Sequence, residues 1–392
     1  MFKIQYFDNI SVLGITQFSK DLYTIGRQIS EPDAIILRSK NIFEINLPSN
    51  LLAVGRAGVG VNNIPVKRLT SLGIPVFNAP GANSNAVKEL VLAALLISSR
   101  NICQARDYIR DPNYSDDDLK QKFETSKKLF SGFELQGKTL GVVGLGSIGT
   151  NVANSALALG MKVIGFDPKI TVKNTRQLLP GVEKVEKLEK ILVDSDAITL
   201  HIPLTKETKY FINSSCFNLM KENSILINFA RGEVVDNKAV TKALGGNILQ
   251  SYVCDFPTSE LISNEKVIAL PHLGASTFEA EENCAHMVVK NVKNFLENGN
   301  IRNSVNFPDA ILKNSKLFRL AIANRNVPNM VGQISTILAN DGYNIEDLLN
   351  QSLGTLAYTL VDLNKPLSEE IIDKIKKIDG VLSIRNVGKP LS

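Results

Sequence analysis

The stretch Thr139–Asp167 reads TLGVVGLGSIGTNVANSALALGMKVIGFD and predicts a strand, a glycine turn, a helix and a second strand in direct succession. Residues 140–145 are a short apolar run, which suits a buried strand. Residues 148–159 have helical periodicity, and Gly160 is suited to end that helix. Residues 161–166 form the next apolar run. The order is that of a β-α-β unit.

The glycines of this turn are spaced as Gly144-x-Gly146-x-x-Gly149. Gly144 permits a tight turn, Gly146 lets the backbone approach a pyrophosphate, and Gly149 lets the helix lie close to the strand. The helix N-terminus offers free N–H groups to phosphates. Asp167, 18 residues after Gly149, can accept hydrogen bonds from ribose hydroxyls and repel a 2′-phosphate. The pattern favours NAD over NADP as cofactor; the alternative is a glycine-rich turn in an ordinary α/β domain.

Length, composition and net charge limit the classes of protein to which the chain can belong. At 392 residues the chain is longer than one hydrophobic core usually serves, so we expect two or three domains. Its 44% hydrophobic and 21% charged residues are typical of a soluble globular protein. The net charge of +5 is spread along the chain without a Lys/Arg block, so neither nucleic acid nor a membrane is expected as a partner.

Cysteine spacing and the N-terminal residues indicate the environment. The four cysteines include no CxxC pair, so we expect no metal site and no disulfide framework. The start, MFKIQYFDNI, lacks a signal-peptide profile, and no apolar run approaches the ~20 residues of a membrane span. A cytoplasmic location is therefore expected.

The first 98 residues predict a separate small parallel α/β domain. Its predicted strands are residues 2–7, 34–37, 51–54 and 75–77. The loop GRAGVGVNN, residues 55–63, combines small residues with Arg56, which suits an anionic ligand. A flexible loop with a solvent-facing arginine explains it equally well. Residues 86–99 are so apolar that they predict a buried helix between domains.

Only three histidines exist, which limits the choice of a general base at neutral pH. His286 lies in the long amphipathic helical pattern of residues 277–298, which favours a packed or surface role. His201 ends a strand and suits either a cofactor neighbour or a structural residue. His272 follows a short strand in the loop PHLGAS, where open parallel sheets bind ligands.

Three further candidates follow predicted strands or a turn. Arg231 ends a strand in NFARG and precedes a glycine. Asp255 and Glu260 flank a turn, and an acid beside a histidine raises the histidine pKa. On spacing alone, a structural role explains each of these residues equally well.

Together these motifs resemble those of the D-isomer-specific 2-hydroxyacid dehydrogenases. The resemblance rests on NFARG with Arg231, on Glu260, on PHLGAST with His272 and on the glycine fingerprint. Glu260 follows Arg231 by 29 positions, as in that family, and the 12 positions from Glu260 to His272 imply only a shortened loop. The loops GRAGVGVNN and NAPGANSNAVKEL narrow the resemblance to the phosphoglycerate dehydrogenase branch, over essentially the whole chain.

The resemblance implies NAD-dependent oxidation of 3-phospho-D-glycerate (3-phosphoglycerate) to 3-phosphohydroxypyruvate, the first step of phosphorylated L-serine biosynthesis. His272 would be the general base and acid, Glu260 would hydrogen-bond to it and orient it, and Arg231 would bind the substrate carboxylate. Arg56 and Gly58 would contact the substrate, with Arg56 recognising its phosphate.

The resemblance also assigns cofactor contacts and an assembly. The cofactor contacts are Gly144, Gly146, Ser147, Ile148, Gly149, Asp167, Phe229, Ala230, Asp255 and Gly274, with Asp255 near the nicotinamide. A basic residue from a neighbouring subunit can assist in the family, and Lys127 and Lys128 are the candidates. The chain would form a homodimer or a homotetramer.

Residues 317–392 predict a β-α-β-β-α-β unit that resembles an ACT domain, a small effector-binding module. The implied effector is L-serine or another amino acid, at Asn326 and Asn344, which are 18 residues apart as in the serine-binding pattern. Two departures leave serine sensitivity open: Asn324 stands where that pattern has histidine, and Asn329 replaces a glycine. The alternative is a domain that only mediates assembly.

The predicted fold class is α/β, with two Rossmann-like or flavodoxin-like doubly wound parallel-sheet domains and a C-terminal ferredoxin-like βαββαβ domain. The expected boundaries are 1–98 with 286–310 for the substrate domain, 99–285 for the NAD domain and 317–392 for the ACT domain. Two alternatives stay open. One is another D-2-hydroxyacid dehydrogenase, such as a hydroxypyruvate, glyoxylate or 2-oxoglutarate reductase, and the other is a non-catalytic NAD-sensing protein similar to a corepressor.

Overall fold

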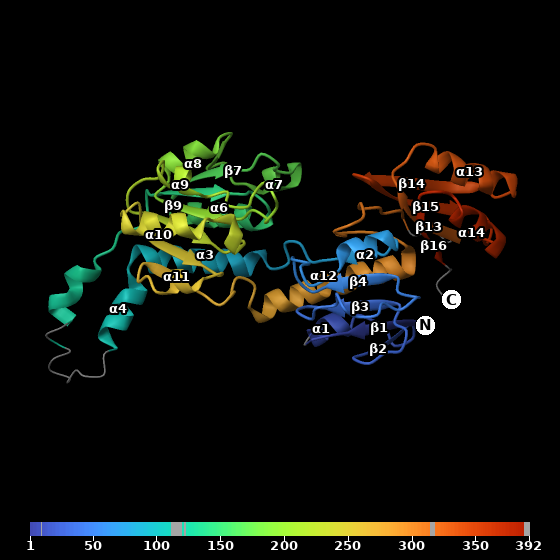
Figure 1. Cartoon of the computed structure of the whole chain (residues 1–392), viewed down its shortest axis with the longest axis horizontal. Coiled ribbons are helices and arrows are strands. Elements are labelled where there is room, and N and C mark those ends of the chain that lie inside the picture. The colour runs from blue at the N-terminus through green and yellow to red at the C-terminus, as the bar shows by residue number, and fades with distance from the viewer. Residues whose placement is uncertain (9, 111–119, 121–122, 314–317, 388–392) are drawn as a thin grey trace. The chain divides into compact units, whose positions relative to one another are not determined.

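A computed structural model describes residues 1–8, 10–110, 120, 123–313 and 318–387 of the chain (Figure 1). The chain divides into two compact units: the first unit contains residues 1–83 and 278–392, and the second unit contains residues 84–277. The acidic run at residues 116–118 lies outside the described residues.

The second unit is built on a seven-stranded sheet in which every strand pair is parallel. Its order is β12-β11-β10-β9-β6-β7-β8. The strands are β6 (Thr139–Val143), β7 (Lys162–Phe166), β8 (Val182–Val185), β9 (Ala197–Leu200), β10 (Ser224–Asn228), β11 (Leu249–Cys254) and β12 (Val267–Ala269). The order in which strands are added to the sheet reverses direction between β6 and β9. Ligands bind outside the carboxyl ends of parallel strands at such a reversal.

Helices cover both faces of this sheet. Helices α3 (Ser84–Ser99) and α6 (Ser147–Ala158) bury their apolar residues on one face. Helices α8 (Leu188–Asp194), α9 (Ser214–Phe217) and α10 (Asn237–Gly245) cover the other face. Further helices of this unit include α4 (Ile102–Ile109), η1 (Lys127–Phe130), α7 (Val172–Gln177), η2 (Gly232–Val234) and α11 (Ser259–Ile262).

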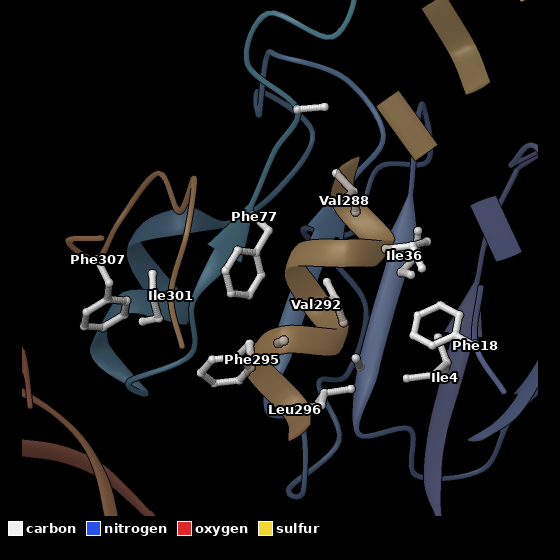
Figure 2. Packing of buried hydrophobic residues seen from close by; sticks show 14 of the residues in the cluster. Ile4, Phe18, Ile36, Phe77, Val288, Val292, Phe295, Leu296, Ile301 and Phe307 are labelled. Carbon is white, nitrogen blue, oxygen red and sulfur yellow. The ribbon is translucent and has the colours of Figure 1, made fainter. Parts of the chain in front are cut away.

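The first unit contains a five-stranded parallel sheet of order β2-β1-β3-β4-β5, the flavodoxin order. Its strands are β1 (Phe2–Tyr6), β2 (Tyr23–Gly26), β3 (Ala34–Leu37), β4 (Ala53–Arg56) and β5 (Val76–Phe77). Helices α12 (Phe278–Asn298) and α1 (Val12–Ile15) lie on one face, and α2 (Val66–Ser71) lies on the other. Figure 2 shows Val288 and Val292 of α12 beside Ile36 and Phe77 in this core.

The C-terminal domain, also in the first unit, is a four-stranded antiparallel sheet of order β14-β15-β13-β16 with two helices on one face. Its elements are β13 (Phe318–Arg325), α13 (Met330–Asn340), β14 (Ile345–Leu353), β15 (Leu356–Leu363), α14 (Glu369–Lys376) and β16 (Val381–Val387). The predicted fold class is therefore confirmed in all three of its parts.

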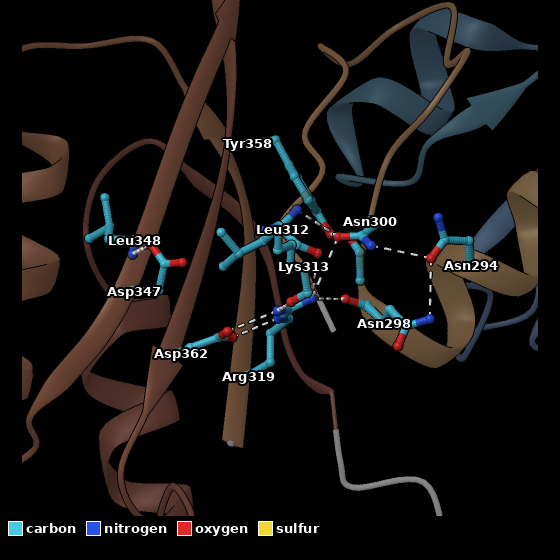
Figure 3. Close-up of polar contacts among 11 residues, drawn as sticks. Asn294, Asn298, Asn300, Leu312, Lys313, Arg319, Asp347, Leu348, Tyr358 and Asp362 are labelled. Atoms are coloured by element: carbon cyan, nitrogen blue, oxygen red, sulfur yellow. Dashed lines mark hydrogen bonds and ion pairs between the residues drawn. The ribbon is translucent and has the colours of Figure 1, made fainter. Parts of the chain in front are cut away.

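A buried ion pair fixes the C-terminal domain to the end of α12 (Figure 3). Arg319 and Asp362 lie directly opposite each other on β13 and β15, are 4% and 1% exposed, and form a two-pronged contact of 2.6 and 2.8 Å. The same guanidinium donates to the carbonyls of Asn298 (2.9 Å) and Lys313 (2.6 Å). Removing one partner would leave a buried charge, which typically destabilises by roughly 3–5 kcal/mol.

The unit boundaries, after residues 83 and 277, differ from the predicted ones, after residues 98 and 285. Helix α3 lies wholly in the second unit because it packs on α6, and α12 lies wholly in the first because it covers the sheet there. Strands β2 and β8 and helix α4 were not predicted. Strand β8, VEKV, is half or fully exposed and lacks an apolar signal.

Candidate active site

The glycine turn after β6 is shaped by close contacts. Gly144 has φ of +93°, and a Cβ there would lie 2.6 Å from the carbonyl oxygen of His201. A Cβ on Gly149 would overlap the carbonyl oxygen of Gly144. Any larger residue at either position would therefore displace the start of α6 from the sheet.

The start of α6 is open. Gly146 precedes the helix and has no side chain to cap its first amides, and a Cβ built on it meets nothing within 4 Å. The amides of Ser147, Ile148 and Gly149 lie in the first turn, where N–H groups have no partner within the helix. Space beside unpaired N–H groups at a helix N-terminus fits a phosphate group.

Asp167 follows β7 and borders this turn. Its carboxylate accepts hydrogen bonds from the amides of Leu145 (2.9 Å) and Lys169 (2.8 Å). Each oxygen retains a second acceptor position, so the same carboxylate can still accept from a sugar hydroxyl. Asp167 thus holds the turn as well as bordering the predicted cofactor site.

Three predicted site residues follow three neighbouring strands. Arg231 comes after β10, Asp255 directly after β11, and His272 after β12. Because these strands are adjacent and parallel, the three segments lie at the same edge of the sheet as the glycine turn. The structure thus brings together the cofactor and catalytic candidates of the second unit.

Asp255 anchors the segment that carries His272. It is 2% exposed, and its two carboxylate oxygens accept from the amides of Leu273 (3.0 Å) and Gly274 (2.8 Å). Burial raises the pKa of Asp255, while these amides and the nearby charge of His272 oppose the rise. Gly274 was expected to contact the cofactor, and its amide already has a hydrogen-bond partner in Asp255.

Phe256 is a neighbour of His272 that the sequence reasoning missed. The two rings lie 4.7 Å apart between centroids and are tilted by 52°. A Cβ on Gly232 would lie 3.1 Å from Cβ of Phe256, so the segment after Arg231 also approaches this ring. The sequence signal that could have identified Phe256 was its position directly after Asp255, a predicted site residue. His272 itself is exposed and has φ of +57°, which is unusual for a residue other than glycine.

Arg231 is held at its base by the end of β10. Asn228, fully buried, donates to the carbonyl of Arg231 (2.9 Å) and accepts from the amide of Ala230 (3.1 Å). The guanidinium donates through Nη1 to the carbonyl of Ala230 (2.6 Å), which leaves further N–H groups for a carboxylate. Phe229 is buried beneath this turn.

Glu260 contacts helix α10 through Thr241. It lies exposed in the first turn of α11, and its Oε1 accepts from Thr241 Oγ1 of α10 (3.2 Å). The expected Glu260–His272 pair stays a prediction, beside the contact of the same carboxylate with Thr241.

The other two histidines have different environments. His201 Nε2 lies 3.0 Å from Thr199 Oγ1, and burial lowers the pKa of His201 to about 3, so the ring is neutral at pH 7. His286 is exposed on α12 in the first unit.

The predicted substrate residues Arg56 and Gly58 belong to the first unit. Arg56 ends β4, and its Nε donates to the carbonyl of Arg38 (3.0 Å). A Cβ on Gly58 would lie 2.5 Å from Nη1 of Arg56, so the guanidinium extends over this glycine. A side chain at position 58 would therefore have to displace this guanidinium.

The predicted effector residues Asn326 and Asn344 are exposed on the C-terminal domain. Asn326 donates to the carbonyl of Gly354 (3.1 Å), and Asn344 donates to Glu346 (2.7 Å). Asn324 is buried and bonded to Thr359, whereas Asn329 adopts φ of +63° before α13. Asparagine tolerates this conformation, which explains how it replaces the expected glycine.

The remaining expectations concern metals, membranes and basic residues. Among the described residues, no group of three or more His, Cys, Asp or Glu side chains is placed to hold a metal. No described helix is long and apolar enough to span a membrane. Lys127 forms an ion pair with Glu124 (2.6 Å) at the start of η1, and Lys128 beside it is exposed.

Comparison with known proteins adds a family and named relatives. Residues 92–274 match the family described as D-isomer specific 2-hydroxyacid dehydrogenase, NAD binding domain. A D-3-phosphoglycerate dehydrogenase of Methanocaldococcus jannaschii is 38% identical over 291 residues, 72% of this chain and 53% of the relative, so the chain spans about half of that relative's length. The enzyme of that name from Haemophilus influenzae is 32% identical over 355 residues, 87% of this chain and 82% of the relative.

A solved structure agrees with these relatives. The cofactor (NAD+) bound 3-phosphoglycerate dehydrogenase in Entamoeba histolytica is 26% identical, has a TM-score of 0.62, and covers 78% of this chain and 98% of its own.

Proposed function

The chain belongs to the D-isomer-specific 2-hydroxyacid dehydrogenases, and from this premise we propose that it oxidises 3-phospho-D-glycerate to 3-phosphohydroxypyruvate with NAD. The observation that carries the proposal is the common sheet edge: Arg231, the Asp255-anchored His272 segment and the open start of α6 all lie there. The substrate is suggested by the names of the relatives. The family resemblance assigns this reaction to phosphorylated L-serine biosynthesis.

The side chains have complementary tasks in this reaction. Removing a hydride from a secondary alcohol requires a base for the hydroxyl proton, and His272 takes it through a ring nitrogen. Arg231 binds the neighbouring carboxylate with two N–H groups, which a lysine could not reproduce. Asp255 and Phe256 are positioning residues for His272, because one holds the backbone amides directly after it and the other contacts its ring.

The chain's own residues fit the cofactor. The amides of residues 147–149 would hold the pyrophosphate, the empty space at Gly146 would admit it, and Asp167 would accept from the adenosine ribose. NAD, when bound, supplies the hydride acceptor. Arg56, held over Gly58, would bind the substrate phosphate.

The assay that tests the substrate is NADH oxidation by the purified chain. The acids to compare are 3-phosphohydroxypyruvate, hydroxypyruvate, glyoxylate, pyruvate and 2-oxoglutarate. We expect the highest kcat/KM for the phosphorylated acid. A preference for any unphosphorylated acid would refute the substrate and the role of Arg56, whereas NADH binding without turnover would favour the sensor alternative.

Replacing the base tests the mechanism. His272→Ala is expected to lower kcat roughly 10²–10⁴-fold, the usual contribution of a general base, with the Kd for NADH unchanged. The matched control is His286→Ala, an exposed histidine of the first unit, which should leave both constants unchanged. A His272→Ala variant with near-normal kcat would exclude this histidine as the base.

Glu260 requires a separate test because its carboxylate contacts Thr241. If Glu260 orients His272 during turnover, Glu260→Gln will lower the pKa of the base in the pH profile of kcat/KM. Thr241→Val, which removes only the observed partner, will leave that pKa unchanged. Equal profiles for all three proteins would restrict Glu260 to the α10–α11 contact.

The proposal extends to assembly, effector and location. A homodimer or homotetramer is expected, which sedimentation of the full chain would establish. An amino-acid effector at Asn326 and Asn344 predicts that serine, or another amino acid, lowers the rate and that Asn344→Ala abolishes the effect. The cytoplasmic location expected from the sequence would be checked by cell fractionation.

A further inference from the structure

A cavity of about 450 Å³ lies within the first unit, between the first domain and the C-terminal domain. Its walls come from residues 47–52, Arg68 and residues 72–74 of the first domain, Phe295 of α12, and residues 383–385 of β16, among others. Cavities that bind small molecules usually have volumes of roughly 300–1,000 Å³.

The charges of this cavity have one sign. Its lining includes two arginines, Arg68 and Arg385, and no aspartate or glutamate. Within the described part of the chain, neither arginine forms an ion pair with a carboxylate. Arginine stays protonated at physiological pH, so two positive charges face a common space without an anion from the protein.

Arg385 is only partly satisfied. Its Nη1 and Nη2 donate to the carbonyls of Leu296 (3.3 Å) and Phe295, at the C-terminal end of α12, and its guanidinium lies 4.3 Å from the centroid of the Phe295 ring. The Nε atom is shielded from solvent and has no hydrogen-bond partner. Burial lowers the pKa of Arg385, which reflects a charge held in unfavourable surroundings.

Docking on α12 explains only part of this arrangement. The carbonyls at the end of a helix offset a nearby cation by roughly half a charge. They do not involve Arg68, an exposed residue of α2 that lines the same cavity. An anion in the cavity would pair with Arg68 and would offset the charge of Arg385.

We propose that this cavity binds a small organic anion whose carboxylate or phosphate group is held by Arg385 and Arg68. The rest of the lining is largely apolar and includes Leu47, Leu72 and Ile384, so the ligand carries a short apolar body. Ser383 already joins the two walls by donating to the carbonyl of Gly73 (3.0 Å). A ligand there contacts both domains and therefore stabilises their contact.

The test is binding to the full chain, measured by titration calorimetry with inorganic phosphate and, separately, with 4-methylpentanoate, which has a carboxylate and an apolar body but no 2-oxo group to reduce. Saturable binding of phosphate identifies a phosphorylated ligand, and binding of 4-methylpentanoate identifies a carboxylate. Arg68→Met should weaken that binding about tenfold to a hundredfold, the effect of one charge-assisted contact. Binding of neither probe overturns the proposal.

Two control variants locate the bound probe. Arg302→Met removes an exposed arginine of the same unit that does not line the cavity, and it should leave affinity unchanged. Arg56→Met removes the arginine proposed for substrate phosphate and should also leave this binding intact. An affinity that falls in Arg56→Met and not in Arg68→Met would contradict the cavity as the site.

Discussion

Two glycine-containing loops follow the ends of β4 and β6, and they offer positive charge to a ligand in different ways. After β6, the empty space at Gly146 exposes backbone N–H groups at the start of α6. After β4, the space at Gly58 is filled by the guanidinium of Arg56, which Arg38 holds through its carbonyl. The loop after β6 is a backbone site, which depends on small residues at fixed spacing. The loop after β4 is a side-chain site, which depends on the groups that position its arginine.

The largest effect is expected at the backbone site. Gly146→Val would fill the space beside the first turn of α6, and losing two charge-assisted contacts should raise the Kd for NADH roughly a hundredfold. Fluorescence titration with NADH measures this. Gly245→Ala is the control, because that glycine also faces open space but lies in α10. Unchanged affinity in Gly146→Val would show that the pyrophosphate does not enter there.

A smaller and more selective effect is expected at the side-chain site. Gly58→Ala places a methyl group where Nη1 of Arg56 now lies, so the KM for the phosphorylated substrate should rise about tenfold, as for one weakened charged contact. The Kd for NADH should not change. An equal rise in KM for an unphosphorylated acid would indicate general damage to the loop, and the two loops would then not have separate ligands.

Asp167 sharpens the comparison because it adds a negative charge to the backbone site. Asp167→Asn should narrow the preference for NADH over NADPH by about tenfold, since the repulsion of a 2′-phosphate is lost. The ratio of the two Kd values measures it. A ratio equal to that of the unchanged chain would mean that Asp167 serves only to hold the amides of Leu145 and Lys169.

The smallest effect concerns His201, whose carbonyl borders Gly144. Its pKa is lowered from 6.5 to about 3 in the folded chain, so the unfolded chain binds more protons between these values. The stability contributed by neutral His201 is therefore present above pH 6.5 and is lost as the pH falls toward 3. Between pH 6.5 and 5.5 the free energy of unfolding should fall by about 1 kcal/mol from this group.

Urea unfolding at the two pH values tests this. His201→Gln, which can keep a hydrogen bond to Thr199, should remove that part of the pH dependence. A slope that His201→Gln leaves unchanged would assign the acid sensitivity to other groups.

The sequence was most informative where a constraint is local. Gly149 is dictated by the carbonyl of Gly144 within the same β-α-β unit, so its steric role could be inferred from spacing. The order of β13 to β16 followed in the same way from short apolar runs and turns.

Contacts between distant segments could not be inferred in this way. The Asp255 contact with Leu273 and Gly274 depends on the path of a loop 18 residues later, and the Glu260 contact with Thr241 of α10 could not be read from spacing either. Arg319 and Asp362 meet only because β13 and β15 pair in one register, which residue identities alone did not reveal. Half-exposed strands such as β8 give no apolar signal at all.

The apolar core that α12 forms with the first sheet continues into the C-terminal domain. Phe295, Leu296 and Phe307 belong to the same buried cluster as Tyr358 and Leu360 of β15. A descendant that lost the C-terminal domain by a single deletion would therefore expose part of its own core. Such a loss would become tolerable only after polar replacements along this face, so the shared core by itself favours retention of the domain.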